Sequence, residues 1–290
     1  MAESPTDGGI AEQRPHALIR ALRADYPARM APRRSPTADA APADGGPRRS
    51  SVQSVERAFS ILDLLKESSV AMSALELSRA SGLDRTVVHR LLRTLAAQNL
   101  VVEERGSYAL GPAWVLLANH YVDNLLVRRL ALPYMLDFQA AAIGDKSWAV
   151  TLMIPVGDLV TVVERIWTRG VPLSTVLEIG DTFAIDLAAA GRAMLAYRPP
   201  EEARSLLGDE RYGAVAPVLE RAREVGGVAL SRGEAMPGVY AVAAAIRSRR
   251  GHAVASIAVA GLDLGDQLSD ESLLAGQLRR TAHAVGQSLA

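Results

Sequence analysis

A run of basic side chains on a short helical segment offers the clearest chemistry in the sequence. At helical steps of about 100° per residue, five polar side chains fall on one face and the apolar side chains fall on the other. The polar face consists of Arg85, Thr86, His89, Arg90 and Arg93. Guanidinium groups donate paired hydrogen bonds to guanine or to phosphate, and a threonine hydroxyl reaches a base edge or a phosphate. Because this face carries no acid after Asp84, the pattern predicts a DNA-recognition helix, with an ordinary solvated surface as the alternative.

The residues around this helix predict a helix-turn-helix. Ser73-Ala-Leu-Glu76 is a capping box, which begins a helix that Gly82 ends. Asp84 then caps the recognition helix, which we expect to end near Gln98. Two short helices joined by a tight glycine turn are typical of this motif.

Two further elements complete this domain. An amphipathic stripe predicts a first helix from about Gln53, and residues 101–110 read as two short strands around a turn at Arg105. We therefore expect a winged helix-turn-helix over residues 51–111, with Arg105 as a further DNA contact.

Outside this domain the chain changes character three times. Residues 1–50 hold seven of the 15 prolines and few large apolar residues, so we expect a disordered extension. Residues 112–124 have apolar side chains at helical spacing and predict a linker helix that also pairs two subunits. Residues 125–290 alternate helical and strand patterns and predict a mixed α/β domain. Its predicted helices are 125–143, 186–197 (which begins with small residues), 201–207, 215–225 and 269–289, and its predicted strands are 147–154, 159–167, 239–246 and 253–260.

Composition restricts the classes of protein. The 290 residues suit about two domains, and 49% hydrophobic residues suffice for a core in each. The chain has no cysteine and five scattered histidines, so we expect no disulfide, no metal site and no cofactor. Basic and acidic residues balance at 32 each, which limits DNA contact to local patches. No long apolar run or signal peptide occurs, and we expect a cytoplasmic protein without a membrane segment.

Several separated motifs resemble those of the IclR family of transcriptional regulators. The similarity covers about residues 51–290, and its segments occur in the family's order. The segments are Ser54–Leu62, Leu75–Leu83, Thr86–Leu95, Ala190–Ala196, Gly227–Glu234, Pro237–Ala243 and Ala255–Gly261.

The resemblance implies an α+β protein, with an amino-terminal winged helix for operator DNA and a carboxy-terminal GAF-like domain for a small effector. It also implies homodimers, often paired as dimers of dimers, that bind a palindromic operator. Members of the family usually repress transcription, and their effectors are commonly small organic acids.

The resemblance also places an effector pocket. It lies between the loop Leu187–Gly191 and facing strands, and it would involve Ala189, Ala190, Gly191, Ser231, Ala241, Ala258 and Ala260. Free backbone donors at a helix start suit a carboxylate. Family members that bind small keto acids carry two serines where this chain has Ala258 and Ala260, and Ala241 and Ser231 replace a cysteine and an aspartate. Either the ligand is more apolar or none binds, and tight sheet packing explains the alanines equally well.

Three functions follow from these patterns. The first is a ligand-responsive DNA-binding regulator, more often a repressor. The second is an orphan regulator whose carboxy-terminal domain only assembles or contacts protein. The third is an enzyme with Asp181, Asp186, Glu234 or His252 as acid or base, which we disfavour because the sequence has no nucleophile elbow or phosphate loop.

Overall fold

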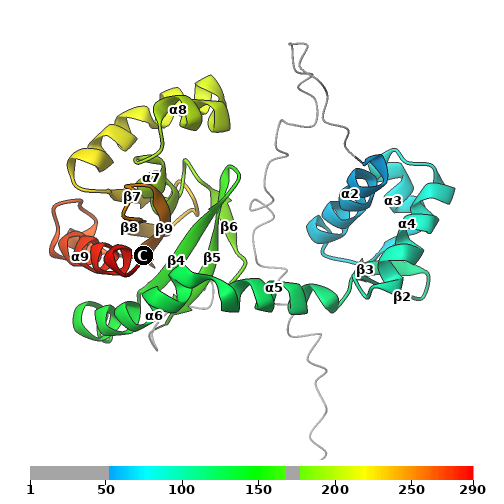
Figure 1. Ribbon diagram of the computed structural model, residues 1–290, viewed down its shortest axis with the longest axis horizontal. Helices are drawn as coiled ribbons and strands as arrows, with labels where there is room; N and C mark the ends of the chain where they lie inside the picture. Colours follow the sequence, from blue (N-terminus) through cyan, green and yellow to red (C-terminus); the bar gives the residue numbers. More distant parts are fainter. Residues whose placement is uncertain (1–51, 168–176, 290) are drawn as a thin grey trace, which may run out of the picture. The chain divides into compact units, whose positions relative to one another are not determined.

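The computed structural model describes residues 52–167 and 177–289, and its first part is a small helical bundle with a hairpin (Figure 1). Its helices are α2 (Gln53–Glu67), α3 (Ala74–Ser81) and α4 (Arg85–Ala97). Its strands are β1 (Met72–Ser73), β2 (Val101–Glu104) and β3 (Ser107–Leu110), in the order β1-β3-β2. The predicted winged helix-turn-helix is thereby confirmed. The predicted extension over residues 1–50 lies outside the described residues.

Local signals fix the ends of these helices as predicted. The Ser73 hydroxyl accepts a hydrogen bond from the Glu76 backbone N–H at 3.3 Å, and the Glu76 carboxylate accepts one from the Ser73 N–H at 2.8 Å. Gly82 ends α3 at φ +69°, in the left-handed region that favours glycine. The Asp84 carboxylate accepts a bond from the Thr86 N–H at 2.7 Å and so begins α4.

The bundle has its own hydrophobic core, to which every helix and both hairpin strands contribute. Its buried residues are Ile61, Leu62, Leu65, Ala74, Leu77, Val88, Leu92, Leu95, Val101 and Tyr108. The contribution of α4 is its apolar face, so its polar face is left to solvent.

Helix α5 (Ala113–Asn124) follows the hairpin and buries none of its own residues. The Trp114 indole N–H donates to the Leu100 carbonyl at 2.8 Å, which ties the start of α5 to the residue just before β2. Leu116, Leu117 and Tyr121 expose more than half of their surface. The helix was predicted; Trp114 packs against the core of the bundle, whereas Val115, Leu116, Leu117 and Tyr121 are left exposed by residues 52–167 and 177–289.

The second part is a six-stranded antiparallel sheet with helices on both faces (Figure 1). The strands are β4 (Ala149–Val156), β5 (Leu159–Ile166), β6 (Thr182–Ala184), β7 (Val228–Arg232), β8 (Tyr240–Arg247) and β9 (Ala253–Gly261), in the order β6-β5-β4-β9-β8-β7. The helices are α6 (Leu126–Phe138), α7 (Ala189–Leu195), α8 (Pro200–Glu224) and α9 (Leu273–Ser288). The predicted α+β class is confirmed.

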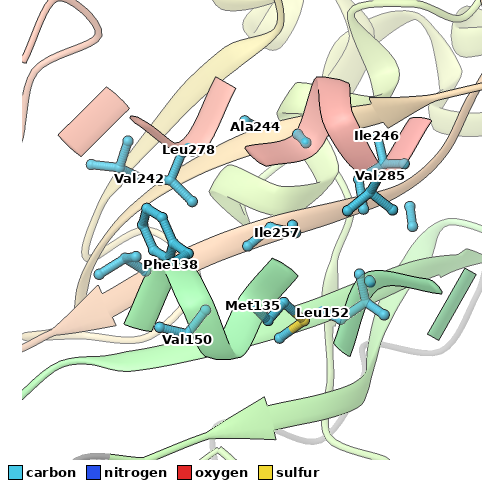
Figure 2. Close-up of a cluster of buried hydrophobic side chains, with 14 of the residues drawn as sticks. Met135, Phe138, Val150, Leu152, Val242, Ala244, Ile246, Ile257, Leu278 and Val285 are labelled. Carbon is cyan, nitrogen blue, oxygen red and sulfur yellow. The ribbon is translucent and has the colours of Figure 1, made fainter. Parts of the chain in front are cut away.

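One face of this sheet packs against α6 and α9, and large aliphatic side chains fill the space between them. Figure 2 shows Met135 and Phe138 of α6, Leu278 of α9 and Val150 and Ile257 of the sheet gathered in one cluster. Side chains alternate between the two faces of a strand, so the residues between these belong to the other face. That second face carries α7, which contacts β7, β8 and β9.

The structure corrects several predicted boundaries in this part. The helix predicted over 186–197 is shorter, because the Leu187 and Ala188 N–H groups bond back to the Ala184 carbonyl and form a turn. The helices predicted over 201–207 and 215–225 run as α8, with non-helical backbone at Gly208.

Other boundaries shift at the ends of the second part. The closing helix predicted from Ser269 begins at Leu273, where the Ser272 hydroxyl accepts from the Ala275 N–H at 3.1 Å. The helix predicted to run to Ile143 is α-helical only to Phe138, where α6 ends, and a π-helical turn follows over Gln139–Ile143. Strands β6 and β7 were not predicted.

Among residues 52–167 and 177–289, no helix combines the length and the apolarity that a bilayer crossing requires. The same residues contain no group of three acidic or histidine side chains arranged to hold a metal ion.

Candidate DNA-binding face and effector site

The polar face of α4 is fully available to a ligand. All five predicted side chains, from Arg85 to Arg93, are exposed. None of Arg85, Arg90 and Arg93 forms an ion pair with another described residue. The opposite face holds the buried Val88, Leu92 and Leu95 and fixes the helix in the bundle. The structure therefore brings the basic side chains together on a rigid element, with donors that no other described residue occupies.

The acid nearest this face in the sequence serves the backbone instead. The backbone hydrogen bond from Thr86 holds the pKa of Asp84 below its ordinary value. Asp84 thus carries its charge at the helix N-terminus, where the helix dipole favours it.

Arg105 lies at the tip of the hairpin. Its φ of +53° and the +80° of Gly106 give the two-residue turn the left-handed backbone typical of a tight hairpin. The Arg105 side chain is exposed. The wing therefore presents one cation at its tip.

The predicted effector residues gather on the α7 face of the sheet. Ser231 pairs with Ala241, and Ala241 pairs with Ala260, so these three form one row across β7, β8 and β9. Ala258 lies on the same face in the next row, opposite Ala243. The other three predicted residues, Ala189, Ala190 and Gly191, form the first turn of α7.

Tight packing closes α7 onto its surroundings. All seven residues of the helix are buried. A Cβ added to Gly191 would overlap the Ile185 carbonyl oxygen and would lie 2.6 Å from the Ile185 Cα. Of the predicted effector residues only Ala241 is half-buried, and the others are buried. The small side chains thus have a packing role in this structure.

Two hydroxyl groups on this same face lack partners among the described residues. The side-chain oxygens of Thr151 and Ser256 are buried without a hydrogen bond to any of these residues, and both Thr151 and Ser256 are completely inaccessible to solvent. Thr151 pairs with Ala258, and Ser256 pairs with Met153 and Ala245. A buried unpaired hydroxyl is unfavourable by about 1–3 kcal/mol. Neither residue was predicted, although strand alternation from Ala258 places Ser256 on the same face.

Ser231 is committed to an internal network. Its hydroxyl donates to the Glu234 carboxylate at 3.2 Å, and the Arg192 guanidinium donates to the same carboxylate at 2.8 Å. Arg192 also donates to the Asp186 and Leu230 carbonyls at 2.7 and 2.9 Å. Burial raises the pKa of Glu234, but the bonds from Arg192 and from the backbone lower it more, so the pKa lies below its ordinary value. The network ties α7 to β7.

A second network holds α8. Arg211 of α8 donates to the Asp186 carboxylate at 2.5 and 3.1 Å and to the Asp158 carboxylate at 2.9 Å. The bonds with Asp186 hold the pKa of Arg211 above its ordinary value.

Three of the four residues considered as enzymatic acids or bases have structural partners. Asp186 and Glu234 are ion-paired with arginines. Burial raises the pKa of Asp181, whose carboxylate accepts a bond from the Glu178 N–H at 2.7 Å. His252 is exposed.

Family models match both parts of the chain. The IclR helix-turn-helix domain matches residues 54–105, and the bacterial transcriptional regulator IclR C-terminal domain matches residues 119–287.

Individual relatives agree with these matches. The glycerol operon regulatory protein of Streptomyces griseus is 29% identical over 72% of this chain and 85% of its own length. The transcriptional regulator Rv1719 of Mycobacterium tuberculosis is 30% identical over 69% of this chain and 79% of its own length. The transcriptional repressor IclR of Escherichia coli is 25% identical over 60% of this chain and 61% of its own length.

Solved structures share the fold. An IclR-family regulator from Brucella abortus superposes with a TM-score of 0.71 at 21% identity, covering 87% of this chain and 97% of its own. An IclR homologue from Microbacterium hydrocarbonoxydans, solved with 4-hydroxybenzoate, superposes with a TM-score of 0.63 at 19% identity, covering 81% and 98%.

Proposed function

The chain belongs to the IclR family of DNA-binding transcriptional regulators, and from this premise we propose that it is an operator-binding repressor controlled by a small organic acid. Members of this family are regulators and not enzymes. The observation that carries the proposal is the exposed face of α4, whose three arginines are free of ion pairs with described residues.

In this proposal α4 enters the major groove. Arg85, Arg90 and Arg93 donate to guanine or phosphate, while Thr86 and His89 contact base edges or the backbone. Arg105 at the wing tip contacts a neighbouring phosphate. Because the chain is neutral overall, affinity depends on these local donors more than on long-range attraction.

Two copies of the chain bind a palindromic operator together. The support is the exposed apolar surface of α5, including Leu116, Leu117 and Tyr121, which a second copy would cover. A two-fold dimer presents two recognition helices and so requires matching half-sites at a fixed spacing. Sedimentation shows whether the chain is a dimer or a dimer of dimers. A monomer that binds the operator with full affinity would contradict this arrangement.

The DNA proposal is tested by replacing the arginines of α4 one at a time with alanine. Each base-reading arginine should weaken operator binding by about 1–3 kcal/mol and relax specificity at one position, whereas a phosphate contact weakens all sequences equally. Arg129→Ala is the matched control, since Arg129 of α6 is also exposed and has no ion pair with a described residue. Operator affinity unchanged in all three folded α4 variants would refute the recognition face.

The proposed effector has an acidic head and an apolar or aromatic body. The backbone N–H groups of Ala189, Ala190 and Gly191 begin α7 and suit a carboxylate. Ala258 and its neighbours offer an apolar wall, and the unpartnered hydroxyls of Thr151 and Ser256 lie on the same face. The solved homologue with 4-hydroxybenzoate supports the idea that this fold can hold an aromatic acid.

Thermal-shift measurements with 4-hydroxybenzoate, benzoate, pyruvate and glyoxylate test this class of effector, because a ligand that binds only the native state raises the melting temperature. We expect the aromatic acids to stabilise the protein and the small keto acids to do so less. Ala258→Leu should still bind the operator but should no longer respond to the acid. A stronger shift with pyruvate or glyoxylate would overturn the preference for an apolar body.

Thr151→Val separates a ligand contact from a packing role. If the hydroxyl bonds the effector, the variant should weaken its binding while the unliganded protein keeps or gains stability, since an unpaired buried group is removed. Thr161→Val is the control, because the Thr161 hydroxyl already donates to the Asp181 carbonyl at 3.2 Å.

A regulator without an effector is the second candidate. It is favoured by the burial of the predicted effector residues under α7 and by the close approach of Gly191 to Ile185. No stabilisation by any acid, with operator binding intact, would support it. The sign of regulation is tested separately with an operator-controlled reporter, in which deletion of a repressor raises transcription.

A further inference from the structure

A basic cleft of about 740 Å³ lies where the turn between β8 and β9 meets α9. Its basic lining consists of Arg247, Arg249, Arg279, Arg280 and His283. No aspartate or glutamate of the described residues lines it. None of the predicted effector residues lines it, so this cleft is distinct from the site proposed above.

Two separate elements supply these cations. The turn Arg247-Ser-Arg-Arg-Gly251 contributes Arg247 and Arg249. On α9, positions 279, 280 and 283 fall within about 100° of one another at helical spacing, so their side chains share one exposed face. The fold thus brings two basic segments, about thirty residues apart in the chain, to one concave surface.

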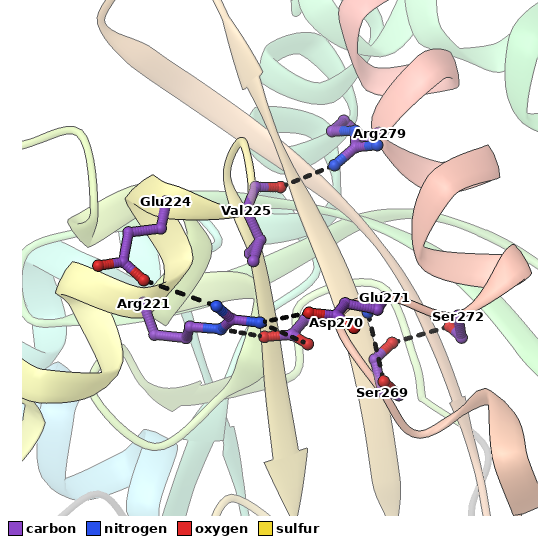
Figure 3. A network of polar contacts seen from close by, with 8 residues as sticks. All are labelled: Arg221, Glu224, Val225, Ser269, Asp270, Glu271, Ser272 and Arg279. Carbon is purple, nitrogen blue, oxygen red and sulfur yellow. Dashed lines mark hydrogen bonds and ion pairs between the residues drawn. The ribbon is translucent and has the colours of Figure 1, made fainter.

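Two of the arginines are held in place by neutral groups. The Arg247 guanidinium lies over the Tyr197 ring, 4.4 Å from its centre. The Arg279 guanidinium donates to the Val225 carbonyl at 3.0 Å (Figure 3). Gly226 leaves room for Arg279, because a Cβ there would lie 2.9 Å from the Arg279 Cδ. Neither contact neutralises a positive charge.

The acids close to this region are already occupied. Figure 3 shows that Arg221 draws Glu224, Asp270 and Glu271 into one cluster, with the nearest bond to Asp270 at 2.8 Å. Six described arginines outside the cleft form ion pairs with acidic side chains. They are Arg128, Arg165, Arg192, Arg204, Arg211 and Arg221. In contrast, the four arginines of the cleft have none among the described residues. Like charges that line one cleft repel one another, and a bound anion would offset this repulsion.

We propose that this cleft binds a small multivalent oxyanion, a compound with at least two phosphate or carboxylate groups. Arginine forks bind both groups with paired, charge-assisted hydrogen bonds. Four guanidinium groups require more than one negative charge for balance. The volume falls within the roughly 300–1,000 Å³ of small-molecule sites and favours a compact ligand over a duplex, which docks on an open surface.

Calorimetry on the full chain in 0.15 M NaCl tests the proposal with pyrophosphate, citrate and acetate. We expect pyrophosphate, citrate or both to bind with one site per chain, and acetate to bind at least tenfold more weakly. The comparison between pyrophosphate and citrate distinguishes a phosphate ligand from a carboxylate ligand.

Variants localise the binding. R249A/R280A should weaken the preferred anion at least tenfold, and both side chains are exposed, so the fold should be retained. R129A/R232A removes the same charge from exposed arginines outside the cleft and should leave affinity within twofold. His283→Glu, which places a carboxylate in the cleft, is the second variant and should also weaken binding at least tenfold.

Three results would overturn the proposal. The first is no binding of pyrophosphate or citrate. The second is binding that the two cleft variants do not change, or that R129A/R232A reduces equally. The third is displacement of the anion by a duplex without operator sequence in a protein whose α4 arginines are replaced, which would assign the cleft to nucleic acid. Failure of any kind leaves operator recognition and the effector site as they stand, because neither uses this cleft.

Discussion

Gly191 allows a sharp test of how α7 sits against its surroundings. Its Cα approaches the Ile185 backbone so closely that a methyl group would overlap the Ile185 carbonyl oxygen and lie 2.6 Å from the Ile185 Cα and carbonyl carbon. Ordinary contacts between these atoms are about 3.5–4.0 Å. Gly191→Ala must therefore displace α7 or Ile185 by about 1 Å.

The magnitude follows from two opposing effects. Overpacking of a closely packed interior is destabilising by about 1–3 kcal/mol, and backbone cannot yield as a flexible side chain can. Alanine favours a helix over glycine by about 1 kcal/mol, which offsets part of this. Since the overlap is with backbone, we expect a net loss of about 1–2 kcal/mol, or about 2–8 °C in melting temperature for a domain of this size.

Gly213→Ala is the matched control. Gly213 is also helical, in α8, but it is exposed, and a Cβ there meets nothing within 4 Å. The free energy of unfolding of this control should rise by about 0.5–1 kcal/mol, because alanine leaves the unfolded backbone less conformational freedom than glycine does. Urea unfolding followed by tryptophan fluorescence measures both variants, with the buried Trp148 reporting on this domain. If Gly191→Ala is as stable as Gly213→Ala, α7 does not pack as closely as the structure has it.

Three further predictions concern stability. Arg192→Met should reduce the free energy of unfolding by about 2–3 kcal/mol, as measured by denaturant titration. This loss is smaller than for a fully buried ion pair, because the side chain of its partner Glu234 is 40% exposed. Because the pKa of Glu234 is lowered in the folded protein, the ionised carboxylate stabilises the fold above the unfolded-state pKa, and this stabilisation is lost as the pH falls through the folded-state pKa. Glu234→Gln lacks this stabilisation, so below the ordinary carboxyl range its melting temperature should fall less steeply than that of the wild type. Ser73→Ala removes the cap of α3 and should be destabilising by about 1 kcal/mol, whereas Ser73→Thr should restore most of it in the same titration.

Helix α4 could be predicted because its signals are local. The bond of Asp84 to the backbone, the left-handed Gly82 and the alternation of Val88 and Leu92 with arginines all act within a few residues. Such signals depend little on the rest of the fold. For the same reason the hairpin around Arg105 was predicted.

Elements of the second part were harder to predict because their patterns are weak or short. Strand β6 has three residues, and β7 is an edge strand that mixes Ser231 and Arg232 with apolar residues. The non-helical Gly208 within α8 and the late start of α7 depend on packing and on backbone bonds to Ala184. Sequence periodicity carries no information about these contacts.

Composition, caps and periodicity are local properties, and they suffice to predict the two-part architecture, the polar face of α4 and the small residues at the start of α7. The contacts that those residues make depend on the tertiary structure. It placed the Thr151 and Ser256 hydroxyls unpartnered beside Ala258, tied Ser231 to Glu234, and joined Arg249 to Arg280 in one cleft. Each of these depends on strand register or on which helix covers which face, and those are set by long-range contacts.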